Sequence, residues 1–235
     1  MGKIVYLMGK SSTGKDTIFK RLLEDSGLNL KNIVPYTTRP IRDGEKNGQE
    51  YFFVDEESYL QLKEQGKIIE ERTYHTFHGQ WRYFTVNDGQ VQQQAQNYLM
   101  IGTLESYLKL KDYFGADRML PVMIELDDGI RLQRALSREM AQDAPRYEEM
   151  CRRFLADSED FAEEKIREAK IEVRFTNNDL DRCLEKIKAY IAQNINQNRK
   201  LPERRVKGHG NQGRPGQPAC AGGADPGESA CGRQL

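Results

Sequence analysis

Short runs of apolar residues alternate along the chain with longer segments in which apolar residues recur every three or four positions. Three runs are apolar almost throughout, which is typical of strands buried on both faces of a sheet: 3–8 (KIVYLM), 98–101 (YLMI) and 120–126 (LPVMIEL). Helical spacing predicts helices over 17–25, 104–114, 129–140, 146–169 and 180–191. Strands that alternate with helices predict an α/β fold, a sandwich with a parallel sheet between helical layers.

Two segments depart from this alternation. Residues 33–86 hold shorter strand-like pieces at 51–54, 68–74 and 82–86, so we interpret this stretch as an inserted lobe. Residues 199–235 are rich in glycine and proline and contain no Phe, Tyr or Trp. A segment with so little apolar surface cannot offset the entropy of ordering, so we predict a disordered tail after one domain over 1–198.

Charge and composition exclude several classes of protein. The 36 Lys+Arg residues balance the 36 Asp+Glu residues, so no basic surplus favours nucleic acid as a partner. No stretch approaches the roughly 20 apolar residues of a membrane span, and the N-terminal apolar run is too short for a secretory signal. We therefore expect a cytoplasmic protein with no membrane partner. No C-x-x-C pair occurs among the four cysteines, Cys151, Cys183, Cys220 and Cys231.

A glycine-rich loop follows the first predicted strand and opens the first predicted helix. It reads Gly9-Lys10-Ser11-Ser12-Thr13-Gly14-Lys15-Asp16-Thr17. The pattern G-x-x-x-x-G-K-[ST] is met at every position except the last, where Asp16 stands. In this setting backbone N–H groups converge on an anion, and the helix N-terminus favours negative charge. The loop therefore predicts a site for ATP, with Lys15 on the β- and γ-phosphates.

Asp16 occupies the position that normally supplies a hydroxyl group to Mg²⁺. Thr17, the next residue, is a candidate substitute. Asp16 is itself a candidate to hold the ion through water. We therefore expect Mg²⁺ as the cofactor, with Asp16 and Thr17 as possible ligands.

A run rich in arginine and glycine follows within the insertion. It contains Thr-Thr-Arg-x-x-Arg, with Arg39 and Arg42, and then Tyr51. Guanidinium groups suit a phosphate monoester because each donates two parallel hydrogen bonds. Taken alone, such a charged run is usually a solvated turn. Downstream of a phosphate loop, it favours a site for a phosphorylated acceptor.

The phosphate loop, the arginine-rich run and a following Ile69-Glu70 stand in the order found in the guanylate kinase family. The chain resembles that family over about residues 3–192. The long run is specific, whereas the glycine loop alone is shared by many nucleotide hydrolases and kinases. The resemblance implies a P-loop α/β sandwich with a nucleoside-monophosphate-binding lobe at about 33–86 and a helical lid at about 131–155. It also implies transfer of the ATP γ-phosphoryl group to GMP.

The resemblance also assigns the acceptor site. The family's ligands for the acceptor phosphate match Arg39, Arg42, Tyr51 and Tyr83. Glu70 matches the carboxylate that accepts from guanine N1–H and the 2-amino group, and Thr85 matches a small hydroxyl residue near the base. Adenine lacks paired donors at that edge and would leave a buried carboxylate unpaired.

On the ATP side, the family's lid arginines match Arg134, Arg138 and Arg153. The turn 176–180 resembles the adenine-binding turn, with Asn177 as the expected contact. The acceptor is already an anion, so the reaction requires no general base. We expect catalysis from alignment and charge neutralisation by Lys15, Mg²⁺ and the lid arginines.

The sequence departs from the family in three places. Pro35 replaces a serine that helps to hold guanine, and proline brings no donor. Residues 101–105 read Ile-Gly-Thr-Leu-Glu in place of an Asp-x-Asp, which leaves Glu105 or Asp16 as the substitute carboxylate. Asp16 itself alters the phosphate loop.

These departures leave two other functions open. Ribose 1,5-bisphosphate phosphokinases are relatives whose loop also reads Gly-Lys-Asp, although Glu70 and the intact arginine-rich run favour a nucleoside monophosphate. The second open function is that of a non-catalytic module of this fold, which binds phosphorylated peptides. Such modules usually lose the loop lysine and the lid arginines, which are present here.

Overall fold

The computed structural model describes residues 1–42, 44–76, 79–91 and 95–197. The chain divides into two units, Met1–Leu201 and Pro202–Leu235. The predicted disordered tail, with Cys220 and Cys231, lies outside the described residues. Among the helices that are described, none is long and apolar enough to cross a membrane.

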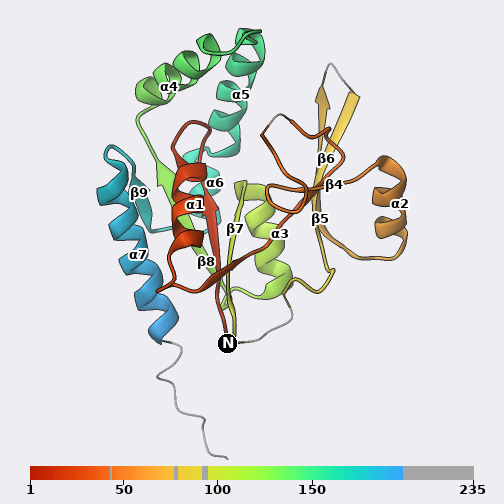
Figure 1. The fold of residues 1–235 in the computed structure, drawn as a ribbon. Coiled ribbons are helices and arrows are strands. Elements are labelled where there is room, and N and C mark those ends of the chain that lie inside the picture. Colours follow the sequence, from red (N-terminus) through yellow and green to blue (C-terminus); the bar gives the residue numbers. More distant parts are fainter. Residues whose placement is uncertain (43, 77–78, 92–94, 198–235) are drawn as a thin grey trace, which may run out of the picture. The chain divides into compact units, whose positions relative to one another are not determined.

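A parallel five-stranded sheet forms the centre of the first unit (Figure 1). Its order is β2 (Leu30–Asn32), β7 (Asn97–Gly102), β1 (Ile4–Met8), β8 (Met119–Glu125) and β9 (Arg174–Thr176). Met8 at the end of β1 is in register with Gly102 on β7 and with Met123 on β8. The predicted α/β fold with a parallel sheet is confirmed, and its carboxyl edge lies where the phosphate loop begins.

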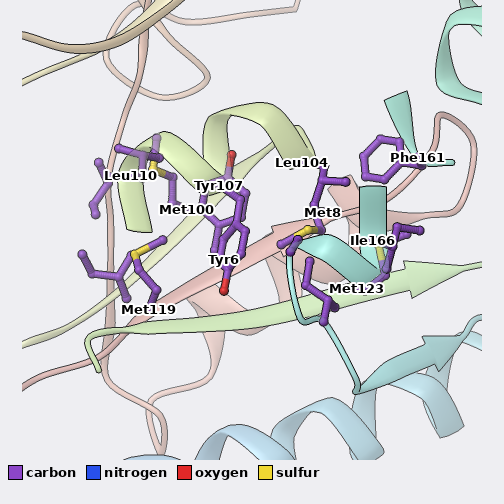
Figure 2. Close-up of a cluster of buried hydrophobic side chains, with 14 of the residues drawn as sticks. Tyr6, Met8, Met100, Leu104, Tyr107, Leu110, Met119, Met123, Phe161 and Ile166 are labelled. Carbon is purple, nitrogen blue, oxygen red and sulfur yellow. The ribbon is translucent and has the colours of Figure 1, made fainter. Parts of the chain in front are cut away.

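Helices cover both faces of this sheet, and alternate residues of β1 point into two separate apolar clusters. On one face, α1 (Lys15–Glu24) and α7 (Leu180–Gln197) pack over Val5 and Leu7. On the other face, α3 (Leu104–Phe114) and α6 (Glu163–Glu168) pack over Tyr6 and Met8, as Figure 2 shows. A fully apolar strand is therefore required at β1, because neither face meets water.

The insertion contains a second sheet of four strands in the order β4 (Phe52–Phe53), β3 (Tyr36–Thr37), β6 (Gly79–Val86) and β5 (Ile68–Thr76). Helix α2 (Glu56–Glu64) is capped by Asp55, whose carboxylate accepts a hydrogen bond from the backbone N–H of Ser58. Tyr59, Phe84 and Val86 form a core of their own. The insertion thus has the strands and the packing of a small lobe.

The predicted helix over 146–169 is wrong, because the chain turns in its middle. Within this range the structure has two helices, α5 (Tyr147–Asp160) and α6, which begins at Glu163. The preceding helix is α4 (Asp128–Met140). Ala162, between α5 and α6, is extended, with φ −62° and ψ 143°. This turn directs Phe161 and Ile166 into the core beneath the sheet (Figure 2). Their burial outweighs the helical continuity that their spacing suggested.

Candidate active site

The phosphate loop between β1 and α1 needs its two glycines for different steric reasons. Gly14 lies in the left-handed region with φ 88°, where a side chain is strained. At Gly9 an added Cβ atom would lie 2.3 Å from the carbonyl oxygen of Ile124. Ser12 is also left-handed, with φ 65°. Loop turns with such left-handed residues are typical of anion sites built from backbone N–H groups.

Asn177 supports this loop from the end of β9. Its Nδ2 donates to the carbonyl oxygen of Thr13 at 2.7 Å, and the Thr13 hydroxyl donates to the carbonyl oxygen of Lys10 at 2.9 Å. A Cβ atom at Gly14 would lie 2.5 Å from the same Nδ2. Asn177 is buried, and its Oδ1 has no hydrogen-bond partner in the described part of the chain. Contact between Asn177 and adenine stays a prediction.

Lys15 and the two residues after it begin α1 at the loop. The Lys15 Nζ atom lies 3.8 Å from Asp16 Oδ2, while the Asp16 side chain is 80% exposed. Thr17 is also exposed. A carboxylate and a hydroxyl therefore stand in solvent beside the loop, where a hard cation with water ligands would fit.

All three lid arginines lie near the loop. Arg138 and Arg153 line a cavity of about 20 Å³ together with Ser11 and Ser12, and Arg153 Nη2 lies 3.5 Å from Ser11 Oγ. An added Cβ atom at Gly14 would lie 3.9 Å from Arg134 Nη1. The structure thus brings the arginines of α4 and α5 to the site expected for the ATP phosphates.

A further arginine of α4, which the sequence analysis missed, joins this helix to the loop. Arg131 is 1% exposed, and its Nε donates to the Ser11 carbonyl oxygen at 2.9 Å. Its Nη2 donates at 2.9 Å to Asp157 Oδ2, which also accepts from the Ser11 N–H at 2.7 Å. Asp128 is a further partner, and the guanidinium lies over the ring of Phe154. The only sign of this role in the sequence is the helical spacing between Arg131 and Ala135, which places both residues on the buried face of α4.

Arg39, Tyr51 and Tyr83 converge in the insertion. Arg39 is 3% exposed, with its Cζ 5.6 Å from the centre of the Tyr51 ring and its Nη2 bonded to Glu45 Oε1 at 2.8 Å. The rings of Tyr51 and Tyr83 meet edge to face at 5.6 Å. Burial, and then the neighbouring Tyr83, raise the pKa of Tyr51 to about 12. Its phenol therefore stays protonated at neutral pH as a hydrogen-bond donor.

Arg42 is joined to this group through a backbone contact. Its N–H donates to Glu45 Oε2 at 2.8 Å, so one carboxylate holds both arginines of the motif. The Arg42 side chain is exposed. Its charge contributes, after those of Arg152 and Arg153, to lowering the pKa of Glu149 on α5. The structure therefore joins Arg42 to Arg39 through Glu45, and the part of its guanidinium in holding the acceptor phosphate stays a prediction.

Glu70 and Thr85 form a buried pair within the sheet of the insertion. The Thr85 hydroxyl donates to Glu70 Oε1 at 2.7 Å, across the pairing of β5 with β6. Arg72, which the sequence analysis also missed, donates from Nε to Glu70 Oε2 at 3.2 Å and from Nη1 to Thr103 Oγ1 at 3.2 Å. Burial opposes the charge on Arg72, but nearby Glu70 outweighs it and raises the pKa of Arg72. The i, i+2 spacing of Glu70 and Arg72 on one strand was the available signal.

Thr103 lies in the segment where the family resemblance leads us to expect an Asp-x-Asp. Its hydroxyl accepts from the backbone N–H of Ser106 and so caps α3. The Tyr6 hydroxyl donates to the Thr103 carbonyl oxygen at 3.1 Å, and a Cβ atom at Gly102 would lie 2.0 Å from that same hydroxyl. Glu105 is exposed and bonds to Lys109 at 2.7 Å. A hydroxyl thus replaces a carboxylate at this position, and it faces Arg72.

Each half of the predicted site holds a cation. Lys15 adjoins Asp16 at the phosphate loop, and Arg39 adjoins Tyr51 in the insertion. Transfer between two phosphates requires that the two halves face each other. That arrangement stays a prediction.

Comparison with known proteins gives a consistent result. The guanylate kinase family model matches residues 1–101. A guanylate kinase of Porphyromonas gingivalis is 30% identical over 200 residues, which cover 83% of this chain and 99% of that protein. The chain belongs to the guanylate kinase family. A second member, from Mycoplasma mobile, is 30% identical over 215 residues that cover 83% of this chain and 95% of that protein.

The crystal structure of guanylate kinase from Anaplasma phagocytophilum has the same fold. It matches with a TM-score of 0.55 and 23% identity, over 82% of this chain and 85% of that one. Membership of the guanylate kinase family therefore agrees with the parallel sheet and the phosphate loop seen here.

A larger cavity of about 420 Å³ lies beside the loop, near the ends of β8 and β9. Its lining combines apolar side chains with Lys10 and the carboxylates Glu125, Asp127, Asp128 and Glu163. Arg174 pairs with Glu125 and Glu163, and Arg131 pairs with Asp128. For this member of the guanylate kinase family, binding of the ATP phosphates by the loop and its arginines stays a prediction.

Proposed function

We propose that this protein is a guanylate kinase that transfers the γ-phosphoryl group of ATP to GMP and yields ADP and GDP. Membership of the family supports the reaction. The observation that carries the assignment to residues is that arginines of α4 and α5 gather at the loop with Lys15, while a second, buried arginine, Arg39, lies beside Tyr51 in the insertion. Each of the two cationic groups suits one of the two phosphate-bearing substrates.

The chemistry follows from charge and alignment. A phosphate oxygen of GMP attacks the γ-phosphorus of ATP, and the bond from that phosphorus to the bridging oxygen breaks, leaving ADP. The attacking oxygen is already anionic, so the protein needs no base. Lys15 and the lid arginines Arg134, Arg138 and Arg153 neutralise charge that spreads over the transferred group. An arginine in this role is worth about 10³–10⁵ in rate.

Mg²⁺ fits the residues beside the loop. Asp16 and Thr17 offer exposed oxygen atoms, and no group of three or more His, Cys, Asp or Glu in the described part of the chain forms a dedicated metal cage. Mg²⁺ usually binds through one or two protein oxygens, waters and substrate phosphates. Bound there, the ion would shield the β- and γ-phosphates and orient them. Asp16 would hold it through water, and Thr17 would offer its hydroxyl group.

The acceptor phosphate would bind Arg39, Tyr51 and Tyr83, and Arg42 would join them when the lid closes. Support comes from the exposed Arg42 guanidinium, whose charge reaches Glu149 on α5. We place the acceptor lobe at about 33–86 and the lid at about 131–155, within a domain that ends near residue 198. Closure would exclude water and prevent simple hydrolysis of ATP. A cytoplasmic location would supply both nucleotides.

Release of ADP tests this proposal when purified protein, ATP and Mg²⁺ are supplied with GMP, dGMP, AMP, UMP or ribose 1,5-bisphosphate in turn. We expect turnover with GMP and little release without an acceptor. Lys15→Ala should abolish transfer, while Lys20→Ala, on the exposed side of the same helix, should not. Turnover with ribose 1,5-bisphosphate alone, or none with any acceptor, would contradict the proposal.

A further inference from the structure

The carboxylate expected to bind the guanine base, that of Glu70, is fully buried in this chain. The Glu70 side chain is 0% exposed. One of its oxygens accepts from Thr85 and the other from Arg72. Each oxygen of this buried carboxylate therefore already has a donor within the protein.

Arg72, the partner of Glu70, is slightly exposed. Its side chain is 11% exposed. A guanidinium carries five N–H donors, and the two hydrogen bonds to Glu70 and Thr103 use one donor each. Arg72 also acts on Tyr51, because its charge opposes the raised pKa of that phenol.

A guanidinium recognises acceptor atoms, which changes what the pocket can read. Arginine has no acceptor of its own, and Arg72 stays charged beside Glu70. On a guanine base, O6 and N7 are neighbouring acceptors that a guanidinium binds as a pair. Adenine presents a 6-amino donor in place of O6, so donor would face donor. The serine that helps relatives to hold guanine is Pro35 here, which leaves that task without its usual donor.

We propose that Arg72 binds O6 and N7 of the acceptor purine, and that Glu70 and Thr103 are positioning residues that hold its guanidinium. This inference rests on the proposed function and deepens it. Glu70 acts through Arg72 and does not meet the 2-amino group. The acceptor class is then the 6-oxopurine nucleoside monophosphates, GMP and IMP alike, with AMP excluded.

Titration calorimetry of the unmodified protein separates the two ways of reading the base. We expect IMP to bind within about threefold of GMP, because the 2-amino group has no carboxylate to meet. Loss of the N7 acceptor in 7-deaza-GMP should weaken binding by roughly 10-fold. IMP binding roughly 100-fold weaker than GMP, with 7-deaza-GMP equal to GMP, would overturn the proposal.

Arg72→Met supplies the matched test, with Arg82→Met as control. Arg82 is also an ion-paired arginine of this lobe, but it bonds to Glu56 outside the pocket. In Arg72→Met the preference for GMP over 7-deaza-GMP should disappear, while Arg82→Met should keep it. A merely structural Arg72 would weaken both ligands equally and leave their ratio intact, which would refute the proposal. If Arg72→Met does not fold, the ligand series on the unmodified protein decides.

Transfer to GMP, measured on the same preparations, keeps the two proposals apart. Purine binding with the expected ratios but without transfer would remove the kinase function and leave the role of Arg72. Transfer to GMP with the opposite binding ratios would support the kinase function and remove the role proposed for Arg72.

Discussion

Replacing Asp157 by alanine would remove the carboxylate that joins the phosphate loop to the lid. Asp157 accepts from the Ser11 N–H and from Arg131, so the change leaves a buried guanidinium without one of its partners. Breaking a buried ion pair from one side costs about 3–5 kcal/mol. Asp157 is 16% exposed and Asp128 remains as a partner of Arg131, so we expect about 3 kcal/mol.

For a domain of this size each kcal/mol lowers the melting temperature by about 2–4 °C, so the expected loss is about 6–12 °C. Thermal unfolding followed by circular dichroism measures it. The KM for ATP should also rise, because the Ser11 peptide loses a hydrogen bond that holds the loop. Glu164→Ala is the control, since its pair with Arg167 is exposed at 3.7 Å and worth little.

A further variant separates stability from positioning. Arg131→Met combined with Asp157→Ala removes both charges, so most of the lost stability should return. The KM for ATP should stay high, because Ser11 has lost both contacts. A melting temperature within about 2 °C of the parent in Asp157→Ala, with an unchanged KM for ATP, would refute this reasoning.

Three other outcomes are expected. Gly14→Ala should abolish ATP binding through its clash with Asn177, whereas Gly115→Ala, at a similar φ of 89° with open space around it, should not; equal effects would contradict the steric argument. Glu45→Ala should raise the KM for GMP about 10-fold by releasing Arg39, and an unchanged KM would count against that contact. Although burial opposes it, bonding to Lys63 and Tyr59 lowers the pKa of Glu71 below 4.5, so its stabilising effect is present above that pH and is lost as the pH falls through the folded pKa. Glu71→Gln should therefore flatten the profile of melting temperature against pH below 4.5, and parallel profiles would contradict this.

The elements that the sequence predicted well carry their own signals. The strands of the sheet centre are apolar on both faces, and helix α3 has a capping hydroxyl at Thr103 and a positive φ at Gly115 that ends it. The helix predicted over 146–169 failed for the opposite reason. Its break depends on what Phe161 and Ile166 contact in the core, which local spacing does not contain. Strand β2 and helix α2 were missed because their apolar patterns are short and weak.

The site residues divide in the same way, into those with a local sequence signal and those that only the folded chain brings together. The phosphate loop and the arginine-rich run were readable because each is continuous in sequence. Arg131 and Asp157 meet Ser11 across 120 and 146 residues of chain, and Arg72 meets Thr103 across 31. No spacing rule links such positions, so only the folded structure identifies them.

Binding of one linked ligand tests most directly whether the two pockets face each other. In this ligand, adenosine and guanosine are joined through their 5′ positions by five phosphates, so that one molecule spans both sites. Calorimetry should give one ligand per chain, competition by both ATP and GMP, and binding about 10²-fold or more tighter than that of ATP. Binding no tighter than that of ATP, or competition by ATP alone, would show that the pockets do not form one site.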